Sequence, residues 1–106
     1  YAEWIALETY LGGPNQAGAA LKEAGTTHWA IPNSGADNSS GFTALPGGYR
    51  NTNGGFYLMP YQAYFWTASE DNTSGAWGVN LSYDLSKMVR GSHLKAFGYS
   101  VRCVKD

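Results

Sequence analysis

The sequence is poor in charge, and this shortage excludes several kinds of protein. Charged residues make up 14% of the 106 residues, against about 25% in an average soluble domain. Seven Lys and Arg are balanced by eight Asp and Glu, which gives a net charge of −1 without a run of either sign. This balance argues against a nucleic-acid partner and against a basic patch for membranes. No apolar stretch approaches the ~20 residues of a transmembrane helix, so we expect no direct membrane insertion.

Cysteine and histidine are also scarce. Cys103 is the only cysteine, so an internal disulfide is impossible. Cys103 is either a small buried hydrophobe in the last strand or the partner of a cysteine upstream of Tyr1. His28 and His93 are the only histidines, and no third ligand is spaced to complete a zinc site with them.

The chemistry of known catalytic motifs is missing as well. The sequence has no G-x-S-x-G elbow, no P-loop and no H-E-x-x-H pair. Glu70 and Asp71 are neighbours, and adjacent side chains of an extended segment point to opposite faces, which makes a poor acid/base pair. We therefore predict that the protein is not an enzyme.

Glycine and aromatic residues are abundant. The chain holds fourteen Gly, eight Tyr and four Trp, and 43% of its residues are hydrophobic. This mixture favours short strands and turns around one core. It is also typical of recognition surfaces, where Tyr and Trp give a large contact area at little entropic cost.

The hydrophobic pattern predicts two helices near the start of the chain. Trp4, Leu7 and Leu11 share one face of a helix over residues 2–11, with Glu3 and Glu8 off that face. The run Gly-Gly-Pro at 12–14 stops this helix. Asn15 can cap a second, short helix over residues 16–20.

A polar loop is expected over residues 25–41, anchored to the core by His28-Trp29. We predict one short extended segment before it, at 21–23, and others after it, at 42–45, 49–50, 56–59, 63–69, 75–83, 87–90 and 97–105. Asn53-Gly54-Gly55 is a hairpin signal.

In residues 75–83, Trp77, Val79 and Leu81 face inward, and Asn80 and Ser82 face outward. The order predicts an α+β fold, with one longer and one short helix packed on a twisted antiparallel sheet with long loops.

Several sequence blocks together carry a family resemblance. The most specific are ALPGGYR at 44–50 and GYSVRCVKD at 98–106, and others are Phe65-Trp66-Thr67 and Ala76-Trp77. They resemble the Fibrobacter succinogenes major paralogous domain, a family of exported and cell-surface bacterial proteins with a C-type-lectin-like fold. The resemblance implies one domain over residues 1–106 that recognises a ligand.

The family usually carries a further segment before the first helix, with a Cys-Pro and a Gly-Trp-His. That segment is absent, and the chain starts at Tyr1 without a signal peptide. We therefore expect a domain trimmed at its N-terminus from a longer, exported precursor, located outside the cell or on its surface.

Candidate ligand-binding residues lie on the outward face of the late strands, where polar side chains stand between rigid sequence blocks. We list them as Asn80, Ser82, Tyr83, Asp84, Lys87, Arg90 and His93, together with Tyr61 from a second aromatic group. The alternative is an ordinary solvated edge.

Calcium is a candidate cofactor, since many C-type lectins bind sugar through it. It needs ~6–8 oxygen ligands. The candidates are Asp37, Asn38, Glu70 and Asp71, with Asn72 and Asp84 as further oxygens. Neither Glu-Pro-Asn nor Gln-Pro-Asp is present, and these side chains can equally cap turns.

The leading hypothesis is a binding or adhesion module for a glycan or a protein. One alternative is the variable receptor-binding domain of a diversity-generating retroelement, in a phage or on a bacterial surface. The other is a structural domain of a larger surface protein.

Overall fold

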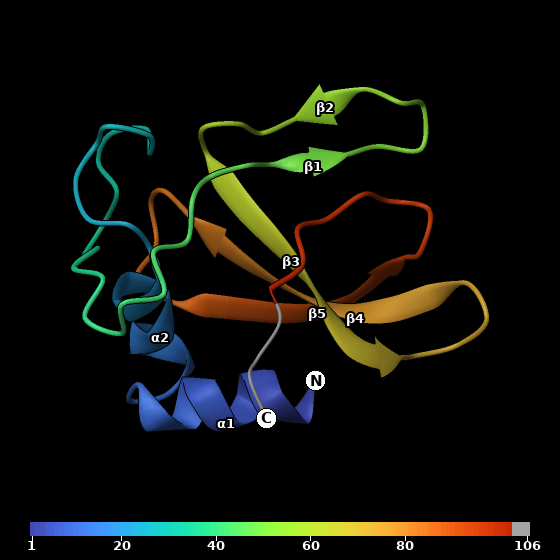
Figure 1. Cartoon of the computed structure of the whole chain (residues 1–106), viewed down its shortest axis with the longest axis horizontal. Coiled ribbons are helices and arrows are strands. Elements are labelled where there is room, and N and C mark those ends of the chain that lie inside the picture. Colours follow the sequence, from blue (N-terminus) through green and yellow to red (C-terminus); the bar gives the residue numbers. More distant parts are fainter. Residues whose placement is uncertain (103–106) are drawn as a thin grey trace.

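The computed structural model describes residues 1–102, which form two helices and two antiparallel sheets (Figure 1). The helices are α1 (Ala2–Tyr10) and α2 (Pro14–Leu21). The smaller sheet pairs β1 (Tyr49–Arg50) with β2 (Phe56–Tyr57). The larger sheet has the order β3 (Gln62–Glu70), β4 (Gly75–Ser82), β5 (Met88–Leu94). The predicted α+β class is confirmed.

Helix α1 follows its prediction closely, and Trp4 and Leu7 pack against the core. Glu8 is the exception: it was expected off the apolar face but is only 4% exposed. Helix α2 begins at Pro14, and Gly13 is its N-cap with no side-chain hydrogen bond. The predicted cap at Asn15 is therefore wrong, because Pro at the first position presets the helical φ one residue earlier.

Strands β1, β3 and β4 also match the prediction to within one residue, but the other predicted strands do not. β5 runs to Leu94 rather than to residue 90, because backbone pairing with β4 continues through Gly91 where the hydrophobic pattern has already ended. The expected strands at 21–23 and 42–45 reduce to a single parallel bridge between Lys22 and Ala44. β2 stops at Tyr57 because Leu58 takes a positive φ of 65°.

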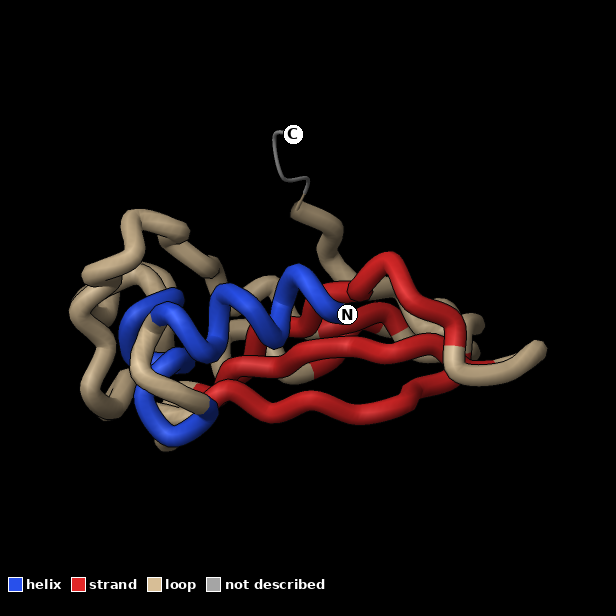
Figure 2. Tube along the Cα trace, turned by 90° about the horizontal axis from the view of Figure 1, so that it is seen from below, coloured by secondary structure: helices blue, strands red, loops and turns tan. Residues whose placement is uncertain are grey.

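The core lies between the helices and one face of the larger sheet. Val79 and Leu81 are fully buried there, as predicted, next to Phe65 and to Leu21 of α2. Trp77 points to the same side but stays partly exposed and packs on the Tyr1 ring, 4.8 Å between centroids. Helix α1 crosses this side of the sheet, whereas β1 and β2 lie on the opposite side (Figures 1 and 2).

The C-terminal segment joins both sheets without forming the predicted strand over 97–105. It makes two isolated bridges, Gly98 with Arg50 and Ser100 with Phe65. Val101 in this segment is 67% exposed, whereas Phe97 and Tyr99 are partly buried. Cys103, for which we predicted either burial or an upstream partner, lies outside the described residues.

Gly48 shows why the block at 44–50 is rich in glycine. Its φ is +66°, and a Cβ at this position would lie 2.0 Å from the Tyr57 carbonyl oxygen. Only glycine permits this approach of the chain entering β1 to the chain leaving β2. The predicted hairpin around Asn53 and Gly54 is confirmed, since β1 and β2 pair on either side of it. In the part of the chain that the structure describes, no helix has the length and apolarity to cross a membrane.

Candidate ligand-binding face

The larger sheet has a second face, turned away from α1, which we call the outer face. Side chains alternate along a strand, so each strand contributes every second residue to it. These residues are Gln62, Tyr64, Trp66, Glu70, Ala76, Gly78, Asn80, Ser82, Val89, Gly91 and His93. Glu70 is the one charged residue in this set; it ends β3, and its carboxylate is paired with Lys95 at 3.1 Å. The predicted orientation of Asn80 and His93 is therefore confirmed, and the outer face is polar and aromatic, with a single ion pair at one end.

A cluster of aromatic rings lies on this face. Tyr99 of the C-terminal segment lies at its centre, 4.3 Å from the Trp66 ring in a stacked pair and 4.9 Å from Tyr64. Phe97 and Tyr49 complete it, with Tyr49 in β1 5.2 Å from the Tyr64 centroid. We call these five rings the aromatic cluster. Each of them is partly exposed, so part of every ring in the cluster is open to solvent.

Two phenols of this cluster, those of Tyr99 and Tyr64, stay protonated over a wide pH range. Burial, with the neighbouring Tyr64 and Tyr49, raises the pKa of Tyr99 to about 12. Burial likewise raises the pKa of Tyr64, with Tyr49 adding to the effect. Both hydroxyls are neutral hydrogen-bonding groups at physiological pH.

The His93 ring packs directly over the backbone of Gly78 and Gly91. A Cβ on Gly78 would be 3.0 Å from His93 Nδ1, and one on Gly91 would be 3.2 Å from Nε2. The Nδ1 atom is buried without a hydrogen-bond partner among the described residues, and burial lowers the pKa of the ring. His93 is therefore a neutral side chain packed into the face, beside the Tyr99 ring at 5.4 Å.

Two side-chain amides form the polar margin of the cluster. Asn80 Nδ2 donates to Gln62 Oε1 at 2.9 Å, across the β3–β4 pair. Ser82 is only 5% exposed, and its hydroxyl donates to Asp84 Oδ1 at 2.6 Å. Ser82 is thus a structural residue rather than an outward ligand contact, because Asp84 and the strand β3 cover it. Asn80 and Gln62 remain half-exposed.

The predicted residues Tyr61, Tyr83 and Lys87 lie at the end of the sheet where β4 turns into β5. The Tyr61 and Tyr83 rings meet edge to face at 5.2 Å, and Tyr61 is 45% exposed. Lys87 is exposed in the turn, away from the aromatic cluster.

This turn is held by a buried lysine that the sequence did not reveal. Lys22 Nζ donates to the carbonyl oxygens of Ser82 and Leu85 at 2.9 Å and of Ser34 at 3.1 Å, and the residue is fully buried. Burial lowers the pKa of Lys22 to about 8, against the opposing effect of Asp84. The sequence does not predict this role for the lysine after α2, because its three acceptors lie far away along the chain.

Arg90 does not belong to the outer face. It pairs in register with Val79, so its side chain points toward α1. Arg90 Nε donates to Glu8 Oε2 at 2.9 Å, and Arg90 Nη1 donates to the Tyr1 hydroxyl at 2.7 Å. The hydrogen bond to Glu8 raises the pKa of Arg90. The prediction that Arg90 shares one binding surface with Asn80 and His93 is therefore wrong, because its side chain lies on the opposite face of the sheet.

The calcium candidates do not come together. Asp37 and Asn38 lie in the long loop near α2, whereas Glu70 and Asp71 end β3 at the far side of the sheet (Figure 1). Each is used locally: Asp37 Oδ1 accepts from Ser39 N, Asn38 bonds Thr43, Glu70 pairs with Lys95, and Asp71 accepts from Ser92. Residues 1–102 contain no group of three or more His, Cys, Asp or Glu side chains that could hold a metal. For Asp37, the alternative role of capping a turn fits the structure better than calcium binding.

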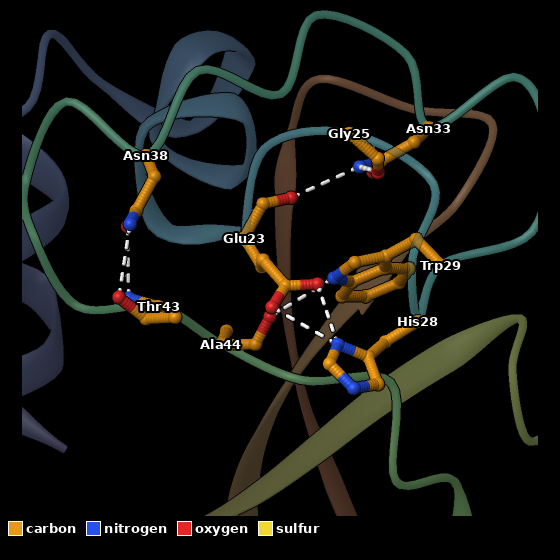
Figure 3. A network of polar contacts seen from close by, with 8 residues as sticks. All are labelled: Glu23, Gly25, His28, Trp29, Asn33, Asn38, Thr43 and Ala44. Atoms are coloured by element: carbon orange, nitrogen blue, oxygen red, sulfur yellow. Dashed lines mark hydrogen bonds and ion pairs between the residues drawn. The ribbon is translucent and has the colours of Figure 1, made fainter.

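The long loop is closed by its own polar contacts (Figure 3). Trp29 is buried and donates from Nε1 to the Ala44 carbonyl at 2.9 Å, which confirms it as an anchor. His28 is instead exposed, and its Nδ1 contacts both carboxylate oxygens of Glu23 at 2.9 and 3.0 Å. Asn33 Nδ2 donates to the carbonyls of Glu23 and Gly25. The loop is therefore a packed element of the scaffold.

A comparison with known families assigns the chain to one of them. The profile of the Fibrobacter succinogenes major domain matches residues 1–105. The chain belongs to this family. No curated protein and no solved structure matched the chain. The matched region includes the block at 44–50 and most of the block at 98–106, which meet at the bridge between Arg50 and Gly98.

Proposed function

We propose that the protein is a binding module of the cell surface or the extracellular space, and that it recognises a neutral glycan through its outer face. The observation that carries this proposal is the partly exposed aromatic cluster around Tyr99, bordered by the amides of Asn80 and Gln62. The one charged residue of this face, Glu70, is neutralised by Lys95. Aromatic rings stack on the apolar faces of sugars, and amides exchange hydrogen bonds with their hydroxyls.

The C-type-lectin-like fold is part of the same proposal. Its support is the order of the elements: two helices, a long packed loop, and then the antiparallel strands that carry the outer face. Recognition in this arrangement would not depend on calcium, because the candidate oxygens of Asp37 and Glu70 lie at opposite ends of the molecule.

A glycan array with neutral and acidic glycans, read with calcium and with a chelator, tests this function. Asn80→Ala should weaken binding about five- to tenfold, the equivalent of one hydrogen bond. Asn15→Ala is the matched control, since Asn15 is exposed on α2 and makes no side-chain hydrogen bond within residues 1–102. Binding that requires calcium, or that selects acidic glycans, would contradict the proposal.

A second candidate is recognition of a protein. It is favoured by an exposed apolar patch, in which Phe56 is 78%, Met59 71% and Ile31 79% exposed. The two segments lie together, because Ala30 N donates to the Pro60 carbonyl at 3.1 Å. Patches of this kind on monomers are often interaction sites. Loss of partner capture by Met59→Ser with glycan binding intact would separate the two functions.

A further inference from the structure

Strand β5 forms an open edge of the larger sheet. It pairs with β4 along Gly75–Ser82, and no residue among 1–102 pairs with its other side. Figure 2 shows no helix or loop running alongside most of this outermost strand, at the lower edge of the sheet. β5 is seven residues long and contains no proline. Such an edge is a template for a further strand.

The hydrogen bond from Lys95 N to the Ser74 carbonyl, 2.9 Å, sets which groups of β5 point outward. In an antiparallel pair the bonded positions alternate, so His93, Gly91 and Val89 direct their backbone N–H and C=O toward β4. The backbone groups of Arg90 and Ser92 then point away from the sheet, as do those of Met88 and Leu94. No described residue bonds the backbone groups of Arg90 or Ser92. The Leu94 carbonyl accepts one bond from Phe97 N.

Charged side chains commonly protect an edge strand from pairing. Arg90 is the only charged residue of β5. Its guanidinium points to the side of the sheet that faces α1 and forms an ion pair with Glu8. The charge is neutralised there, and the edge itself is left without protection. The remaining side chains of β5 are apolar or neutral.

We propose that β5 pairs with β5 of a second copy of this chain, antiparallel and about a two-fold axis at Gly91. This register opposes Arg90 to Ser92 and Met88 to Leu94, so every outward backbone group of the strand has a partner. A shift by two residues would oppose Arg90 to Arg90 or Ser92 to Ser92 and leave outward groups unpaired. The self-complementary register is therefore the one centred on Gly91.

Paired residues of neighbouring strands lie on the same face of a sheet. Val89 of one copy would therefore stand opposite His93 of the other, on the outer face. The two three-stranded sheets would join into one of six strands, with both aromatic clusters turned to the same side. This inference does not depend on the ligand of the outer face.

Sedimentation velocity of the 106-residue chain over a wide concentration range tests the pairing, with a reductant present to keep Cys103 from forming a disulfide. We expect a reversible monomer–dimer equilibrium. Hydrogen exchange then locates the contact: the amides of Arg90 and Ser92 gain protection with protein concentration, whereas those of Val89 and His93 are protected throughout. A chain that stays monomeric, or a dimer with unprotected Arg90 and Ser92 amides, overturns the proposal.

Two substitutions at one position provide the matched variants. Ser92→Pro removes an outward N–H that the monomer does not use, and proline is tolerated at such edge positions. Ser92→Ala keeps the N–H and loses only the hydroxyl bond to Asp71. We expect Ser92→Pro to weaken dimerisation at least about tenfold relative to Ser92→Ala, since each dimer loses two backbone hydrogen bonds. Equal dimerisation of both variants overturns the proposal. If Ser92→Pro fails to fold by circular dichroism, the exchange pattern of the natural chain decides.

Discussion

Arg90 and Glu8 are 82 residues apart in the sequence and form a two-pronged ion pair, with Nε–Oε2 at 2.9 Å and Nη2–Oε1 at 3.3 Å. The pair fastens α1 to β5. Glu8 is nearly buried, so its carboxylate depends on the guanidinium for compensation of its lost hydration.

Removing one partner of this pair should therefore be costly. We expect Arg90→Met to lower the free energy of unfolding by about 3 kcal/mol at neutral pH, measured by urea denaturation. A double variant, Glu8→Met with Arg90→Met, removes the buried charge as well and should recover most of the loss. A single and a double variant of equal stability would show that the carboxylate does not need the guanidinium.

Two neighbouring glycines give a sharp test of backbone geometry. Gly48→Ala should lower the stability by more than about 2 kcal/mol, since φ is positive and the added Cβ would lie 2.0 Å from the Tyr57 carbonyl. Gly47→Ala is the control, because its Cβ would meet only Ser100 Oγ, at 3.8 Å. Thermal unfolding of both variants provides the comparison. Equal losses at the two positions would contradict the geometry of β1 and β2.

Because of Lys22, the free energy of unfolding should increase with pH in the alkaline range. Its pKa is lowered to about 8 in the folded chain, from 10.5. Between these values the unfolded chain binds more protons than the folded chain, so the contribution of Lys22 to stability rises with pH. The rise is up to about 3 kcal/mol. Urea denaturation at several pH values, with Lys22→Met as the variant that lacks the rise, measures it. Parallel pH profiles would refute this effect.

Binding at the outer face should be insensitive to both pH and salt. His93 has a lowered pKa, and Tyr64 and Tyr99 have raised ones, so none of these three groups titrates between about pH 7 and 9. The one charged residue of this face, Glu70, is neutralised by Lys95, so screening by salt has little to act on. Titration calorimetry with a glycan found on the array should give one affinity across this range. A change of more than about threefold would point to a charged contact.

The sequence predicted the regular elements well where a periodic pattern coincides with burial. Trp4 and Leu7 mark α1, and the alternation of Val79 and Leu81 places β4 and the orientation of Asn80. The buried Glu8 could not be predicted in this way. A charged residue is expected in solvent unless its partner is known, and Arg90 lies in a strand whose register the sequence does not define.

The candidate site was predicted only in part for the same reason. Asn80 and His93 reach the outer face by simple alternation. The aromatic cluster, however, depends on Tyr49 and Tyr99 being brought onto β3 from both sides of the sequence by isolated bridges. No local pattern encodes such long-range contacts. The extended C-terminal strand was over-predicted because alternation from Phe97 to Val101 continues where backbone pairing is reduced to single bridges.

The lack of net charge on the outer face, where Lys95 balances Glu70, has a kinetic consequence. A surface with net charge attracts its partner from a distance and accelerates their encounter, whereas this face offers no such field. A ligand would arrive at the ordinary rate of diffusional collision. Tight and weak ligands would then differ in how long they stay on the rings around Tyr99, and dissociation would be the step on which selection among glycans acts.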